Sequence, residues 1–415
     1  MHHADEFETA ALVLGLLLVG GALIAGVARR SFISLTAIFV LAGFVLGDGV
    51  TGVLDFDPTS GFVASLTTVA LIVILFRDGL EVESEMLQSA WRLPLRKLVL
   101  AMPITCVVVA FATHTLTDLP WTASFLVGAL LSPTDPVLSS GVVTNPRVPR
   151  VIRHSLNLES GLNDGLALPA VLAFSAALVT ESDGFVWWRF VLQDVTLGLL
   201  FGVVIGYAAA KLLPTRASVN SHQKSLYALG VAFATYGAAV ATPEGNGFIA
   251  VFVCAIVLGI AREDIGHCFA DRAEDIIELV KVAVFVVFGS LLTFGGLFGD
   301  GWAAVAIVAV TLLVARPVAV FIALAGTRVD TATKGFMAWF GPKGVATMTF
   351  SLLVLGESIP GNERIFNIAA LAVFCSIILH GLSDTPGSNW IAARTESEQA
   401  KQTALEAPEP ARGTA

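Results

Sequence analysis

Charge is scarce in this chain of 415 residues, of which only 14% are Asp, Glu, Lys or Arg while 55% are hydrophobic. Soluble domains average about 25% charged residues, so a soluble globular fold is excluded. The basic residues are scattered along the sequence, which argues against a nucleic-acid partner. The composition instead predicts an all-α integral membrane protein that crosses the bilayer many times.

The motifs of metal and nucleotide chemistry are also missing. The four cysteines stand singly and far apart, so no pair has the spacing of a metal site. The sequence has no His-Glu-x-x-His motif and no phosphate-binding loop of the Walker A type. We therefore expect no cofactor, no enzymatic activity and no nucleotide-driven pump.

Apolar runs long enough to cross a bilayer, about 20 residues each, follow one another along the chain. The first run lacks the basic start of a signal peptide and is therefore predicted to be a retained span. Thirteen spans are predicted: 9–28, 31–50, 61–80, 95–116, 121–143, 155–180, 190–213, 223–242, 246–261, 276–298, 301–325, 333–356 and 364–384.

The distribution of positive charge predicts the orientation. Loops after odd-numbered spans hold sixteen Lys and Arg residues, whereas loops after even-numbered spans hold only Arg189 and Arg364. Because basic loops stay in the cytoplasm, the N-terminus is predicted outside and the C-terminus inside. Residues 1–386 would form the transmembrane domain, and the polar residues 387–415 a disordered cytoplasmic tail.

The span 155–180 contains an unusual density of polar groups, including Glu159, Ser160, Asn163 and Asp164. An ionisable side chain at membrane depth is costly and usually functional. At about 100° per residue, Asn163 shares a helix stripe with Glu159, and Asp164 shares the next stripe with Ser160. Glu159 is interpreted as one half of a structural ion pair, and Asp164 as the group that binds a cation or a proton.

The span 121–143 is interrupted by Pro133-Thr134-Asp135-Pro136. Prolines break helices, and broken backbone at membrane depth lines a cavity or lies buried in protein. The Thr134 oxygens suit a small hard cation, and Asp135 can neutralise the positive end of the following half-helix. The alternative is a simple proline kink.

A second interruption, Gly341-Pro342-Lys343-Gly344, lies in the span 333–356. Paired interruptions are the sequence pointer to a transporter site. Lys343 either offsets a half-helix C-terminus or snorkels to the interface. Arg316 lies deep in the span 301–325 and needs a carboxylate partner, for which Glu159 is the candidate.

In combination these residues resemble the monovalent cation:proton antiporters of the NhaP/NHE branch. The resemblance rests on Thr134-Asp135-Pro136, the segment from Glu159 to Gly165, Arg316, the segment from Trp339 to Gly344, and Phe76 with Gly79-Leu80. It implies an NhaA-like antiporter fold with inverted repeats, two discontinuous crossed helices and a homodimer. Spans within 95–180 and 301–384 would form the moving core, and spans within 9–80 and 190–298 the dimerisation domain.

The resemblance also implies a function, which is exchange of a monovalent cation for H⁺ across the cell membrane. Na⁺ is the first candidate, with Li⁺ or K⁺ as alternatives, and the Asn-Asp pair implies electroneutral exchange. A proton-coupled solute transporter is the nearest alternative, and a cation channel a remote one. The candidate ion-binding residues are Asp164, Thr134, Ser160, Glu159, Asp135 and Asn163, with Arg316 and Lys343 in an electrostatic role.

Overall fold

The computed structural model describes residues 35–82, 92–135, 140–143, 145–179, 187–214, 219–242, 245–357 and 359–406, together with isolated positions between 12 and 20. Across these residues the chain consists of helices and their connections, without strands. The all-α prediction is therefore confirmed for this part. The predicted span 9–28 lies almost wholly outside the described residues.

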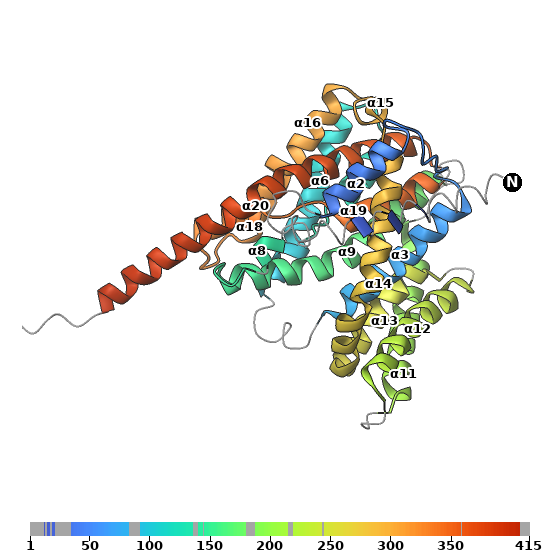
Figure 1. Ribbon diagram of the computed structural model, residues 1–415, viewed down its shortest axis with the longest axis horizontal. Coiled ribbons are helices and arrows are strands. Elements are labelled where there is room, and N and C mark those ends of the chain that lie inside the picture. Colours follow the sequence, from blue (N-terminus) through green and yellow to red (C-terminus); the bar gives the residue numbers. More distant parts are fainter. Residues whose placement is uncertain are drawn as a thin grey trace, which may run out of the picture.

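Most predicted spans coincide with helices (Figure 1). Six described helices are long and apolar enough to cross a membrane: Gly61–Leu80, Arg92–Leu116, Arg150–Val179, Gln193–Leu212, Trp302–Ala323 and Asn362–Ser397. The uninterrupted helices are α2 (Leu35–Leu46), α3 (Gly61–Leu80), α9 (Arg150–Val179), α12 (Ser221–Val240), α13 (Gly247–Ala261) and α14 (Glu263–Ser290), which is followed by the short α15 (Phe294–Leu297).

Three further spans each contain a π-helical turn between two α-helical parts. They are α5 (Arg92–Arg96), η1 (Lys97–Ala101) and α6 (Met102–Leu116); α10 (Trp187–Phe190), η3 (Val191–Val195) and α11 (Thr196–Leu212); and α16 (Trp302–Val310), η4 (Thr311–Ala315) and α17 (Arg316–Ala323). Such turns are often found at functional sites. The turn η1 begins at Lys97 and the turn η4 ends just before Arg316, and both residues belong to the site described below.

Two spans are interrupted where the sequence predicts it. The helix α7 (Trp121–Leu130) ends before Pro133, and α8 (Ser140–Val143) follows the break. The helix α18 (Thr331–Trp339) ends before Pro342, and α19 (Val345–Gly356) begins just after it. Residues 131–135 and 340–344 have no helical structure but are almost all buried, so the simple proline kink is wrong for this first break.

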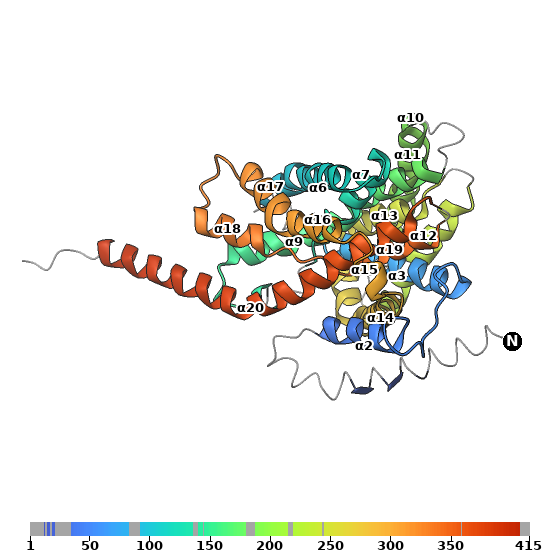
Figure 2. The same ribbon diagram turned by 90° about the horizontal axis from the view of Figure 1, so that it is seen from above.

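The last helix, α20 (Asn362–Glu406), is longer than predicted and projects beyond the other helices (Figures 1 and 2). Residues 387–406 are helical, so the prediction of a disordered tail from residue 387 is wrong for this stretch. The reason is tertiary: Ile391 and Ala392 are buried, and Glu396 pairs with Arg147 at 3.2 Å. The polar composition did not indicate this packing.

Close helix contacts place α9 next to α3 and α13. A Cβ at Gly165 would lie 2.2 Å from the Phe252 ring of α13, and one at Gly161 would lie 3.6 Å from the Asp78 carbonyl oxygen of α3. Glycine at position 165 therefore permits the approach of α13. This packing brings the polar segment of α9 against the C-terminal part of α3.

Candidate ion-binding site between the interrupted helices

The two interruptions lie against each other. The Asp135 amide donates a hydrogen bond to the Pro342 carbonyl at 2.8 Å, and the Thr347 hydroxyl donates to the Leu130 carbonyl at 3.0 Å. Prolines leave the backbone without helical partners at both breaks. The chain satisfies these groups by pairing one break with the other, although the two breaks lie far apart in the sequence.

Each break supplies a charge to a half-helix of the opposite span. Asp135 Oδ2 accepts a hydrogen bond from the amide of Val345, the first residue of α19, at 3.1 Å. Lys343 Nζ donates to the Pro133 carbonyl at 3.0 Å, just beyond the C-terminal end of α7. These signs match the helix dipoles. Lys343 is only 1% exposed, so the snorkelling alternative is wrong, and its contact with the Pro133 carbonyl agrees with the half-helix role.

Glycines make room for the charged side chains at the second break. A Cβ at Gly344 would lie 2.3 Å from Asp135 Oδ2, and one at Gly341 would lie 1.9 Å from Arg316 Nε. Separations under 3 Å require something to move. The two glycines therefore let the carboxylate and the guanidinium lie directly against the backbone of the break.

Glu159 pairs with two cations. Its Oε1 lies 3.0 Å from Arg316 Nη1, which confirms the predicted pair, and its Oε2 lies 2.6 Å from Lys97 Nζ. Lys97 was missed because it lies at the edge of a basic segment and reads as a loop residue. Its side chain is fully buried at the start of η1. Glu159 is therefore held as a permanent anion by one cation from η1 and one from α17.

Asn163 connects α9 to the first break. Its Nδ2 donates to the Thr134 carbonyl at 2.7 Å and to the Thr134 hydroxyl at 3.0 Å. This contact joins the polar turn of α9 to the backbone of the first break. It fixes the distance between the Thr134 oxygens and the polar turn of α9.

Asp164 differs from the other buried acids of the site. The residue is 6% exposed, and its Oδ1 has no hydrogen-bond partner in the described part of the chain. Ser160, one helical turn earlier, is partly buried. A buried polar atom without a partner costs free energy, so an ion or proton bound at this carboxyl group would stabilise the site.

Asp78 of α3 is a site residue that the sequence reasoning did not identify. Its carboxyl group interacts with that of Asp164, and its Oδ2 is also buried without a partner among the described residues. Its Oδ1 accepts a hydrogen bond from Arg77 Nε at 2.9 Å. The signal was present, because Asp78 stands within an apolar span. It was overlooked because only its neighbours Phe76, Gly79 and Leu80 were considered.

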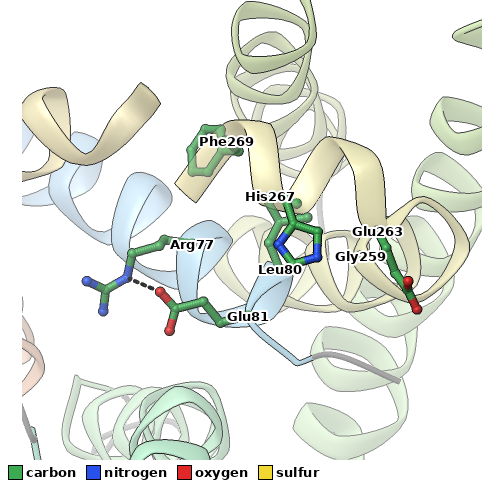
Figure 3. A pocket seen from close by; sticks show the side chains of 8 residues that line it. Arg77, Leu80, Glu81, Gly259, Glu263, His267 and Phe269 are labelled. Carbon is green, nitrogen blue, oxygen red and sulfur yellow. Dashed lines mark ion pairs between the residues drawn. The ribbon is translucent and has the colours of Figure 1, made fainter. Parts of the chain in front are cut away.

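Arg77 lies beside a small cavity of about 40 Å³ at the C-terminal end of α3. Figure 3 shows the ion pair between Arg77 and Glu81, in which Glu81 Oε1 lies 3.7 Å from Arg77 Nε. Residues of α13 and α14, including Gly259, His267 and Phe269, complete the lining. Arg77 thus supplies the positive charge that pairs with both Asp78 and Glu81 at this end of α3.

Buried carboxylates between two interrupted membrane helices are the arrangement of a secondary transporter that carries cations. Comparison with known proteins identifies the family. Residues 15–390 match the family described as "Sodium/hydrogen exchanger, transmembrane", and the chain belongs to this family of membrane cation/proton antiporters.

Three curated relatives illustrate the range of the family. The K(+)/H(+) antiporter NhaP of Alkalimonas amylolytica is 25% identical over 396 residues, covering 93% of this chain and 67% of that protein. The K(+)/H(+) antiporter NhaP2 of Shewanella sp. (strain ANA-3) is 24% identical, covering 92% and 67%. The Na(+)/H(+) antiporter NhaG of Bacillus atrophaeus is 27% identical, covering 84% and 68%.

The fold is similar to a solved structure. The sodium proton antiporter MjNhaP1 from Methanocaldococcus jannaschii at pH 8 superposes with a TM-score of 0.80 at 20% identity, covering 94% of this chain and 99% of that one. The antiporter fold expected from the sequence is thereby confirmed at the level of overall architecture.

Proposed function

We propose that this protein exchanges a monovalent cation for H⁺ by alternating access, with both ions competing for Asp164. The observation that carries the proposal is the buried Oδ1 of Asp164 without a partner. A bare carboxylate is costly to move through a membrane, whereas a neutralised one is cheaper. Binding of either a proton or a cation therefore permits the movement, and the empty charged site resists it.

The charges around Asp164 support a one-for-one exchange. Glu159 is paired with Lys97 and Arg316, and Asp78 is paired with Arg77. Asn163 cannot ionise. We assign the titration to Asp164, so that one proton leaves as one cation enters and the exchange is electroneutral.

The transported cation would be held by oxygen atoms of Asp164, Ser160 and Thr134. Asn163 positions the Thr134 oxygens. Asp135 and Glu159 contribute negative charge from their fixed positions. Hydroxyl, carbonyl and carboxylate oxygens are suitable ligands for a hard cation, but they leave the choice among Na⁺, Li⁺ and K⁺ open.

Na⁺ is our first candidate for the cargo, and K⁺ is the second. The second candidate is favoured by the named relatives NhaP and NhaP2, both K(+)/H(+) antiporters, while NhaG is a Na(+)/H(+) antiporter. This chain spans about two thirds of the length of each, at identities of 24–27%. A proton-coupled solute transporter and a cation channel are the remaining alternatives.

The arrangement in the membrane is part of the proposal. Spans within 95–180 and 301–384 would form the moving core of two inverted repeats, and spans within 9–80 and 190–298 the dimerisation domain of a homodimer. The chain would cross the membrane thirteen times, with the N-terminus outside and the C-terminus in the cytoplasm. The contact between the two breaks supports the core assignment, since they would have to move as one unit.

The deciding experiment is exchange in proteoliposomes that contain a pH-sensitive dye. Addition of Na⁺, K⁺ or Li⁺ in turn should dissipate an imposed pH gradient, and the most effective cation identifies the cargo. Empty liposomes provide the control. Dissipation by none of the three cations would contradict antiport, and single-channel current would favour the channel.

The same liposomes test the stoichiometry. With K⁺ equal on both sides and valinomycin present, the potential is clamped at zero and Na⁺ is the test cation. Electroneutral exchange should proceed at an unchanged rate, although a moving net charge would gain about 2.3 kcal/mol per 100 mV. A current on a solid-supported membrane that persists through steady-state turnover would contradict the one-for-one count.

A further inference from the structure

A large open groove lies outside the ion site, between the α5–η1 segment and the connection from α17 to α18. Its volume is about 810 Å³. Three arginines line it: Arg92 and Arg96 from α5, and Arg328 from the α17–α18 connection. Figure 2 shows α17 and α6 side by side, and α17 also contacts η1. The groove therefore lies at one end of two adjoining membrane helices.

The groove has an excess of positive charge. All three arginines are exposed. Arg96 Nη2 donates one hydrogen bond to the Ala325 carbonyl at 3.2 Å. Among the described residues that line the groove, Asp330 is the one acid. Its Oδ1 accepts hydrogen bonds from the amides of Ala332 and Thr333 and so caps α18. The guanidinium groups thus remain available to an anion.

The wall of the groove is apolar and continues toward the membrane. Leu95 and Val151 line the groove and are 40% and 45% exposed. Exposed apolar side chains then follow along η1 and α17, among them Val99 at 58% and Ile322 at 51%. The charge distribution of the loops predicts that this end faces the cytoplasm, where the membrane surface is rich in anionic lipids.

We propose that this groove binds an anionic phospholipid, with the phosphate between Arg92, Arg96 and Arg328 and an acyl chain along η1 and α17. A free phosphate would use the arginines and leave the apolar wall exposed. A phospholipid covers both surfaces, and basic pockets between membrane helices on the cytoplasmic side are typical of such binding. The occupant is therefore a lipid and not a soluble anion.

The position of the groove connects it to the ion site. The helix turn η1 begins with Lys97, directly after Arg96, and α17 begins with Arg316. Both cations pair with Glu159. A lipid held between α5 and the α17–α18 connection would contact the two elements that fix Glu159, and so stabilise their relative position.

The test is native mass spectrometry of the full chain released from phosphatidylcholine vesicles with and without phosphatidylglycerol. Wild-type protein should retain phosphatidylglycerol. The variant Arg92→Gln/Arg328→Gln should bind it about 30-fold more weakly, since each arginine near an anionic surface contributes about 1 kcal/mol. The matched control Arg147→Gln/Lys211→Gln removes two exposed charges elsewhere on the same predicted side and should bind as wild type does.

Each outcome has a defined meaning. Equal retention by wild type and the groove variant, or equal loss in the groove variant and its control, would overturn the proposal. Displacement of the lipid by excess inorganic phosphate would show a site for a free anion and also overturn it. If the groove variant does not fold, Arg92→Lys/Arg328→Lys keeps both charges and should retain the lipid, and loss in this folded variant counts against the site.

Discussion

The helix α9 carries two buried carboxylates, Glu159 and Asp164, whose surroundings differ in charge and in hydrogen-bond partners. Glu159 and Asp164 are 5% and 6% exposed. On the Glu159 side, Lys97 and Arg316 hold both carboxylate oxygens. On the Asp164 side, Oδ1 has no hydrogen-bond partner among the described residues, and the carboxyl group interacts with that of another acid, Asp78. Burial alone therefore does not distinguish a structural carboxylate from one that binds an ion. The charged and hydrogen-bonding partners of each carboxylate make the distinction.

The physical difference lies in what each carboxylate can exchange. A proton or cation that bound Glu159 would have to displace a buried amine or guanidinium, and an uncompensated buried charge costs several kcal/mol. Asp164 has no bound cation to displace. The two sides of α9 therefore predict opposite responses to mutation: loss of exchange at Asp164 and loss of stability at Glu159.

The largest expected effect is on transport. Asp164→Asn should abolish cation-driven pH recovery in proteoliposomes, because the amide cannot ionise. The unfolding free energy should change by less than about 1 kcal/mol or increase, since an unpartnered buried charge has been removed. Exchange at the wild-type rate would contradict the assignment of Asp164, and a lower melting temperature would contradict its lack of a structural partner.

Removal of the ion pair should instead destabilise the fold. Glu159→Ala leaves two buried cations without a counter-charge, and Arg316→Ala removes one of the two partners of Glu159. Each should lower stability by roughly 3–5 kcal/mol, with Glu159→Ala the more severe. Thermal unfolding in detergent measures the effect. Wild-type melting temperatures in both variants would mean that the pairing contributes no stability.

Lys97→Met should have a smaller effect of the same kind. Arg316 remains on Glu159, but Glu159 Oε2 and the Ser155 carbonyl lose the Lys97 amine. The expected loss is about 1–3 kcal/mol. A double-mutant cycle with Glu159→Gln, read from melting in detergent, should give a coupling energy of about 0.5–3 kcal/mol. A coupling of zero would remove Lys97 from the cluster.

The smallest effect is expected at Asp264, an exposed carboxylate in the first turn of α14. The hydrogen bond from Arg262, together with Lys224, lowers the pKa of Asp264 below its usual range. Because the folded-state pKa is depressed, this stabilisation is present above the unfolded pKa of about 4 and is lost as pH falls below it. Asp264→Asn should therefore cost less than about 1 kcal/mol near pH 7.

The Asp264→Asn variant also tests the contrast with the buried carboxylates of α9. The difference in melting temperature between Asp264→Asn and wild type should shrink as the pH is lowered toward the acid range, while exchange at neutral pH stays unchanged. A constant difference across the titration would show that the carboxylate charge is not the cause. A loss of exchange would mean that the first turn of α14 takes part in transport.

Much of the fold could be predicted from the sequence, because apolar length and proline act locally. The breaks at Pro133 and Pro342 and the pairing of Glu159 with Arg316 were correctly predicted. The length of α20 was not, since Ile391 and Ala392 are buried only by contacts with distant helices. Lys97 was likewise taken for a loop residue because its burial depends on how η1 packs.

The sequence by itself determined which polar groups must lie in the membrane and where its helices must break. Both follow from costs that each residue carries with it: burial of a charge and loss of a backbone donor. Apart from the pairing of Glu159 with Arg316, only the tertiary structure decided the partners. Lys97 meets Glu159 across 62 positions, Asp135 meets Val345 across 210, and Asp78 lies near Asp164. Such long-range pairs depend on helix packing, which also left Asp164 as the carboxylate available to an ion.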